Sequence, residues 1–314
     1  MTSLDYAKLE TVPSRRCIIC DSPMSRAFQK HGYWIVECTS CKHRSAELEP
    51  SLQDALKVYG DDYFEGGGAG YTNYLQEGEL LRARGRKYGE LLQRFASPGR
   101  LLDVGAAAGF VLSGLCDAGW QGVGLEPNQK MADFAVGSLK VDVRQGVLED
   151  LSRSDQFDAV TMIQVLPHFF NPHAALERAA AVTKPGGVWL IETWDRTSIT
   201  ARAFGKNWHE YSPPSVLQWF GRDGLVKLVA RYGFKPVASG RPSKWIAGSH
   251  ARALLEHSVQ GSRLSPLVSL AARLIPKNLA IPYPAEDLCW MAFRKDVGAS
   301  LPRPVPADTA NAAE

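Results

Sequence analysis

Short apolar runs alternate with longer amphipathic stretches along the middle of the chain. Runs of this length, bounded by turn residues, are typical of buried strands. We expect strands at residues 101–104, 123–125, 141–143, 157–163 and 188–192. The stretches between them predict helices at residues 109–118, 129–136 and 173–182. Because strands that alternate with helices form βαβ units, the pattern predicts an α/β fold with a doubly wound parallel sheet.

The same patterns continue at both ends of this region. They predict a helix at 77–95, a helix at 215–232, a strand at 235–238 and a closing strand at 288–293. Residues 241–284 interrupt the alternation. Within them an amphipathic stretch at 264–274 fits a substrate lid, a dimer face or a membrane-surface helix, although packing in a core or an interface is the more common role of such a stretch.

The composition excludes several classes of protein. The chain has 314 residues, of which 45% are hydrophobic and 22% charged, and this excludes collagen-like, disordered and membrane-spanning classes. No apolar run reaches the roughly 20 residues that cross a bilayer. The first ten residues carry acids where a signal peptide needs basic residues, so we expect a cytoplasmic protein.

Four of the six cysteines form two C-x2-C pairs, Cys17 with Cys20 and Cys38 with Cys41. Two such pairs separated by a short segment have the ligand spacing of a tetrahedral four-cysteine zinc site. Two disulfides are the alternative, which the absence of a secretory signal disfavours. The sequence therefore predicts a zinc ribbon, with residues 33–36 as a strand that leads into the second pair.

The charge pattern of the N-terminal region indicates whether it binds nucleic acid. Residues 1–60 contain eight basic and seven acidic residues, with the two signs mixed along the chain. Because a nucleic-acid reader clusters its cations, we expect no nucleic-acid partner. The ribbon is instead interpreted as a structural cap or as part of a substrate pocket.

The residues at the end of the first predicted strand are typical of a binding site for a nucleotide-type cofactor. Open α/β sheets bind ligands at the carboxyl ends of their strands. Asp103 is followed there by a turn of small residues that includes Gly105 and Gly109, and Glu126 ends the next strand, where a carboxylate can accept both hydroxyls of a ribose.

The identity of that cofactor follows from two departures from the dinucleotide motif. A G-x-G-x-x-G fingerprint that begins at Gly105 would need glycine at Ala107 and a small residue at Phe110. Asp103 would also lie awkwardly beside a pyrophosphate, which prefers amide donors. The residues fit the cationic S-adenosylmethionine better than NAD.

Five segments resemble the motifs of class I S-adenosylmethionine-dependent methyltransferases, in the right order. They are residues 101–110, 124–128, 145–150, 157–172 and 184–187. The resemblance implies a seven-stranded Rossmann-like domain. Together with the four cysteines, it is closest to the zinc-ribbon-bearing methyltransferases of bacterial polysaccharide and natural-product pathways, some of which methylate sugars.

The resemblance also implies roles for individual residues. The first motif would hold the methionine end of the cofactor, Glu126 the ribose, and the segment at 145–150 the adenine, while Gln164 would face the sulfonium. The implied cofactor-binding residues are Asp103, Gly105, Ala107, Gly109, Phe110, Glu126, Pro127, Leu148, Glu149, Gln164, Tyr63, Tyr71 and Tyr74. The three tyrosines would cover the site, or would simply pack.

Two histidines are candidates for the general base that a hydroxyl or carbon acceptor requires. His168 follows the fourth predicted strand and His209 follows the fifth. We favour His209, because Glu210 and Tyr211 can orient it or share its role. Ordinary loop histidines are the alternative, and no pair of acids has the spacing of a divalent metal site.

The sequence thus predicts a methyltransferase that uses S-adenosylmethionine and a structural Zn²⁺. We expect the acceptor to be a hydroxyl or carbon of a sugar, a glycolipid precursor or a secondary metabolite. An RNA methyltransferase and a non-catalytic scaffold that binds the cofactor are the alternatives. The expected parts are a zinc ribbon at 1–50, a lid and helical linker at 51–97, the methyltransferase domain at 98–296 with an insertion at 241–284, and a disordered tail at 297–314.

Overall fold

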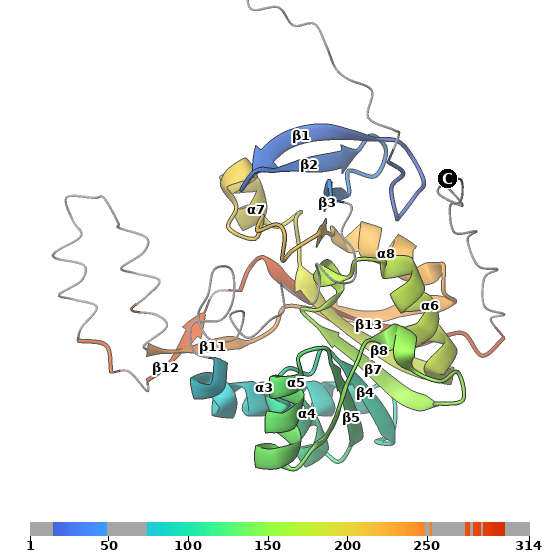
Figure 1. The fold of residues 1–314 in the computed structure, drawn as a ribbon, viewed down its shortest axis with the longest axis vertical. Helices are drawn as coiled ribbons and strands as arrows, with labels where there is room; N and C mark the ends of the chain where they lie inside the picture. The colour runs from blue at the N-terminus through green and yellow to red at the C-terminus, as the bar shows by residue number, and fades with distance from the viewer. Residues whose placement is uncertain are drawn as a thin grey trace, which may run out of the picture.

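A seven-stranded sheet forms the centre of the molecule (Figure 1). The structure, a computed structural model, describes residues 15–48, 74–248, 252, 274–276, 279–283 and 285–298. The strands of this sheet are, in spatial order, β10 (Phe234–Gly240), β13 (Leu288–Lys295), β8 (Thr183–Trp194), β7 (Phe157–Ile163), β4 (Arg100–Val104), β5 (Gln121–Glu126) and β6 (Asp142–Gln145). The last five are parallel to one another, and β13 is antiparallel to both β8 and β10. The predicted doubly wound α/β fold is confirmed.

Helices and short helical turns connect these strands. The helices are α3 (Gly78–Gln93), α4 (Phe110–Asp117), α5 (Gln129–Phe134), α6 (Pro172–Val182), α7 (Ile199–Phe204) and α8 (Arg222–Ala230). The shorter turns are η1 (Tyr74–Glu77), η2 (Ala135–Leu139), η3 (Leu148–Asp150), η4 (Leu166–His168) and η5 (Gly205–Asn207). Side-chain caps begin three of the helices: Asn128, Asn171 and Ser198 each accept a backbone N–H of the first turn.

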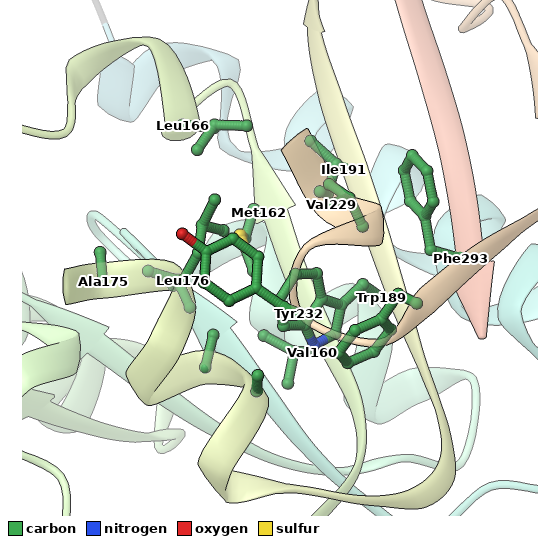
Figure 2. Packing of buried hydrophobic residues seen from close by; sticks show 14 of the residues in the cluster. Val160, Met162, Leu166, Ala175, Leu176, Trp189, Ile191, Val229, Tyr232 and Phe293 are labelled. Carbon is green, nitrogen blue, oxygen red and sulfur yellow. The ribbon is translucent and has the colours of Figure 1, made fainter. Parts of the chain in front are cut away.

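The sheet buries both of its faces. Successive residues of a strand point to opposite faces, so Val160 and Ile191 belong to one core cluster while Ala159 and Leu190 belong to the other. Helices α6 and α8 cover the first face, where the rings of Trp189 and Phe234 stack 3.8 Å apart between centroids. Figure 2 shows how Met162, Leu176, Val229 and Tyr232 fill this face. Burial on both faces explains why the strands are apolar runs rather than alternating ones.

The second face is covered by α3 and α4, whose backbones approach closely. A Cβ at Gly85 would lie 2.1 Å from the carbonyl oxygen of Val111, and one at Gly114 would lie 2.0 Å from that of Arg82. Only glycine fits at this crossing. The contact therefore fixes the position of α3 on the sheet.

A second, four-stranded sheet contains the N-terminal part of the chain, above the main sheet in Figure 1. Its strands are β1 (Met24–Lys30), β2 (Tyr33–Cys38), β3 (Arg44–Ala46) and β9 (Gln218–Trp219), and neighbours are antiparallel. The predicted strand at 33–36 is confirmed as β2. The fourth strand lies between β8 and β10 in the sequence, so this sheet is completed by the part of the chain that forms the main sheet.

The first half of the predicted helix at 215–232 is wrong. Helix α8 begins only at Arg222, and residues 218–219 form β9. All six residues of 215–220 are buried and four of them are apolar, so their pattern fits either period. Residues 218–219 form a strand because they pair with β3 of the N-terminal sheet.

Residues 241–284 contain a small two-stranded sheet. It pairs β11 (Lys244–Ala247) with β12 (Ala280–Tyr283). The amphipathic stretch at 264–274 lies outside the described residues, save for Leu274. Across the part of the chain that the structure describes, none of the helices combines the length and the apolar character needed to cross a membrane.

Candidate functional site

The four predicted zinc ligands come together in the N-terminal sheet. The Sγ atoms of Cys17 and Cys41 are 3.5 Å apart, as are those of Cys20 and Cys38, and all four lie within 4.8 Å of one another. A tetrahedral zinc site with Zn–S bonds of about 2.3 Å would separate its sulfurs by roughly 3.8 Å. All four thiols are free, and their spacing is well beyond a disulfide bond. The geometry fits one zinc ion and does not fit two disulfides.

Residues 215–219 connect the N-terminal sheet and its cysteine cluster, called the ribbon from here on, to the loops at the carboxyl edge of the main sheet. On the ribbon side, the buried His43 donates its Nε2–H to Oε1 of Gln218 at 2.9 Å, and the backbone N–H of Ala46 donates to Leu217. On the other side, the N–H of Leu217 donates to the carbonyl of Pro167 at 2.9 Å. This segment therefore links the cysteine pairs to the turn that follows β7.

Tyr211, a predicted catalytic residue, lies in the contact between ribbon and main domain. It is 2% exposed, and its ring packs edge-on against Phe28 and Trp208. Its hydroxyl accepts a hydrogen bond from Nη1 of Arg44 at 2.6 Å. Tyr211 thus packs at the junction, and its catalytic role stays a prediction.

The loop after β4 has the backbone of a ligand-binding turn. Gly105, Ala107 and Gly109 all adopt left-handed conformations, with φ of 69°, 46° and 80°. Such a conformation is disfavoured for alanine, so Ala107 is held there by its surroundings. Its N–H donates to the carboxyl of Glu126 at 2.8 Å. The loop and the end of β5 thus form one unit at the point where the strand order reverses.

Two buried carboxyl groups line this edge, and within the described residues neither forms an ion pair. Asp103 is 2% exposed and accepts from the hydroxyl of Thr161 at 2.6 Å, while Glu126 is 4% exposed and accepts from the N–H groups of Ala107 and Asn128. Burial raises the pKa of Asp103 to about 7, and burial raises the pKa of Glu126 to about 7 as well. Buried carboxyls that have no cationic partner among the described residues favour a cationic ligand such as S-adenosylmethionine and disfavour a negatively charged pyrophosphate.

This pair of acids predicts how cofactor binding depends on pH. Because a cation favours the ionised carboxyls, the affinity for S-adenosylmethionine is expected to rise about tenfold between pH 6 and pH 8. The stability of the ligand-free protein should change in the opposite direction. The pKa values of the two carboxyls in the folded protein, about 7, lie above their ordinary values of 3.8 and 4.5, so the free energy of unfolding falls as the pH rises from these ordinary values to about 7. Calorimetric titration at several pH values and chemical denaturation measure the two trends. An affinity that stays constant, with Asp103→Asn indistinguishable from the parent, contradicts the prediction.

The other predicted cofactor residues take different positions. Phe110 is 7% exposed, and its ring occupies the space beside Gly78 at the start of α3. Leu148 is buried in the core, while Glu149 is exposed at the edge next to β6 and Pro127 is half-buried after β5. Tyr63 and Tyr71 lie outside the described residues, as does the side chain of Tyr74.

His168 holds two loops together. Its Nδ1–H donates to the carbonyl of Ser215 at 2.6 Å, and its ring meets that of Trp194 edge-on. Burial lowers the pKa of His168 and so favours the neutral form of the ring. The residue ties the turn after β7 to the segment that completes the ribbon sheet.

His209 and Glu210 form a pair at the same edge of the sheet. The Nε2 of His209 is 2.9 Å from Oε1 of Glu210, and Asp287 lies within 4.8 Å of both. Asp287 precedes Leu288, which pairs with Trp194 at the carboxyl end of β8. The imidazole is 60% exposed, so solvent or an acceptor can reach it. Glu210 is therefore in contact with His209, and its role in orienting the imidazole stays a prediction.

A buried group that the sequence analysis did not select lies at the end of β8. The carboxylate of Glu192 is fully buried and accepts from Arg84 and Tyr88 of α3 and from Nε2 of Gln164, the last at 2.8 Å. The sequence signal was an acid at the end of an otherwise apolar strand. Its two partners in α3 are more than 100 residues away, and no local pattern identifies them.

Comparison with known proteins gives a family match over the same region. A family described as "Methyltransferase domain" matches residues 80–239, just over half of the chain. Among curated proteins, the chain is 31% identical over 155 residues to a ubiquinone biosynthesis O-methyltransferase of Maricaulis maris, covering 43% of this chain and 61% of that protein. It is 33% identical over 155 residues to the protein of the same name from Alkalilimnicola ehrlichii, covering 43% and 63%. The chain thus spans about three fifths of the length of these relatives.

A solved structure with a similar fold is a SAM-dependent methyltransferase from Archaeoglobus fulgidus. The two chains are 18% identical with a TM-score of 0.48, and the match covers 71% of this chain and 99% of that one.

Proposed function

Since the chain belongs to the methyltransferase-domain family of class I, S-adenosylmethionine-dependent proteins, we propose that it transfers a methyl group from S-adenosylmethionine to a hydroxyl oxygen of a small phenolic acceptor. The choice of S-adenosylmethionine as the cofactor rests on the pair of buried carboxyls, Asp103 and Glu126, beside the left-handed loop after β4. The acceptor class rests on the relatives named for O-methylation in ubiquinone biosynthesis. It replaces the sugar or glycolipid that the sequence analysis favoured, since neither of these relatives is named for such an acceptor.

The residues of the carboxyl edge divide the work of such a reaction. When bound, S-adenosylmethionine supplies a methyl group on a positively charged sulfur. Asp103 and Glu126 would hold it at the loop that contains Gly105 and Ala107. His209, oriented by Glu210, would take the proton of the acceptor hydroxyl. His168, engaged with Ser215, would keep the neighbouring turn in place rather than act as the base.

The ribbon has a structural role in this proposal. Cys17, Cys20, Cys38 and Cys41 would hold one zinc ion, which would fix β2 and β3 and, through residues 215–219, the loops at the acceptor side of the sheet. The division into a ribbon at 1–50, a linker at 51–97, a methyltransferase domain at 98–296 and a tail at 297–314 is part of the same proposal.

Calorimetric titration with S-adenosylmethionine, with NADH as control, tests the cofactor. We expect stoichiometric binding of the first and none of the second, and a loss of at least about 100-fold in affinity in Glu126→Ala, where a buried charge-assisted contact is removed. Turnover is then measured by mass spectrometry on a panel of catechols and a matched panel of methyl glycosides. Methylation of a glycoside but no catechol contradicts the acceptor, and cofactor binding without any turnover supports the scaffold instead.

A further inference from the structure

The buried carboxylate of Glu192 has a defined set of donors. Its Oε1 accepts from Nη2 of Arg84 and from Nε2 of Gln164, and its Oε2 accepts from the hydroxyl of Tyr88. The side chains of Glu192 and Arg84 are 0% and 13% exposed. The guanidinium of Arg84 is thus the partner charge that a buried carboxylate requires.

This arrangement fixes which way the amide of Gln164 points. An ionised carboxylate can only accept hydrogen bonds, so the NH₂ group of Gln164 must face Glu192 and the amide oxygen must lie on the opposite side. The backbone N–H of Gln164 also donates to the carbonyl of Glu192, at 2.8 Å. These two bonds hold Gln164 in a left-handed conformation, φ 57°, that glutamine rarely adopts.

Gln164 lies beside the loop that would hold the cofactor. It follows β7, the neighbour of β4 in the sheet, and thus lies at the same carboxyl edge as Gly105. A Cβ placed on Gly105 would lie 2.7 Å from the side chain of Val165, the residue after Gln164. The turn at 164–165 therefore packs directly against the loop.

We propose that Glu192 is a positioning residue for the cofactor: it orients the Gln164 amide so that the oxygen, and not the NH₂ group, faces the positively charged sulfur of S-adenosylmethionine. The inference rests on the proposed function. The amide dipole then favours the charged sulfonium over the neutral thioether of S-adenosylhomocysteine, because the ion–dipole interaction is strong in a site shielded from water. Glu192 itself contributes little field, since Arg84 neutralises it.

The experiment is a comparison of two affinities in one set of variants. Dissociation constants for S-adenosylmethionine and S-adenosylhomocysteine are measured by calorimetry in the parent, Glu192→Gln, Gln164→Leu and the double variant. A glutamine at 192 can donate as well as accept, so it no longer fixes the Gln164 amide. We expect Glu192→Gln and Gln164→Leu each to weaken S-adenosylmethionine about tenfold more than S-adenosylhomocysteine, and the double variant to show no further change in this ratio.

Tyr88→Phe is the matched control, because it removes a donor from the same carboxylate while the contact with Gln164 stays. It should weaken both ligands alike and leave the ratio of affinities unchanged. If Glu192→Gln alone does not fold, the double change with Arg84→Gln removes the unpaired cation and gives the same measurement.

The outcomes separate the inference from the function it rests on. A parent protein that binds neither ligand overturns the proposed function. A parent that binds both, with a ratio that Gln164→Leu alters and Glu192→Gln does not, overturns the inference and leaves the function standing. If the double variant changes the ratio of affinities by the combined effect of the two single variants, the inference is also overturned, because Glu192 would then act independently of Gln164.

Discussion

Replacing Cys38 with serine is expected to release zinc and unfold the ribbon, the largest effect on stability that we predict for a single substitution. Structural zinc sites contribute on the order of 10 kcal/mol to small domains, far more than the ribbon strands alone can provide. Cys38 is fully buried and lies at the end of β2, where its N–H also bonds to the carbonyl of His43. The loss should extend to β9, because β3 is the strand with which β9 pairs.

The measurement combines zinc content by mass spectrometry with thermal unfolding, with and without a chelator. Cys116→Ser is the control: Cys116 lies in the main domain on α4, and this variant should keep its zinc and its unfolding temperature. Retention of a full zinc equivalent by Cys38→Ser, or a parent protein that the chelator leaves unchanged, contradicts the four-cysteine site.

Replacing His209 with alanine is expected to lower kcat by about 10²–10⁴-fold, the range typical of a lost general base. The affinity for S-adenosylmethionine should stay the same, because Asp103 and Glu126 at the ends of β4 and β5 are untouched. Glu210→Gln should have a smaller effect, since it removes the orienting charge and leaves the imidazole. Steady-state kinetics and calorimetry on the same preparations separate the two quantities.

His31→Asn is the control for this second prediction. His31 is exposed at the turn between β1 and β2 with φ 50°, a conformation that asparagine tolerates, so kcat should not change. If His209→Ala retains full turnover, the proton leaves the acceptor by another route. If it loses cofactor binding as well, the residue acts on the fold rather than on the chemistry.

Most of the main sheet could be predicted because its strands are buried on both faces. Residues 101–104 and 157–163 are mostly apolar, and both are strands at nearly the predicted bounds. The cysteine cluster could be predicted for a similar reason, since the ligand spacing is local. In each case a short stretch of sequence contains the whole signal.

The features that could not be predicted depend on distant parts of the chain. Residues 218–219 are a strand only because β3 lies beside them, 175 residues earlier. Tyr211 follows Glu210 directly, yet its hydroxyl accepts a hydrogen bond from Arg44, which is 167 residues earlier in the chain. The buried carboxylate of Glu192 is bound by Arg84 and Tyr88, which the sequence indicates only as part of a predicted helix.

The origin of β9 has a consequence for synthesis on the ribosome. The cysteine pairs and the first three strands of the ribbon emerge early, but the strand that completes their sheet is about 170 residues further along. At translation rates of roughly 5–20 residues per second, the outer edge of β3 remains unpaired for on the order of 10–30 seconds, until β9 has been synthesised. Early capture of zinc would keep the nascent ribbon ordered during this interval, so metal supply during translation would set the yield of folded protein.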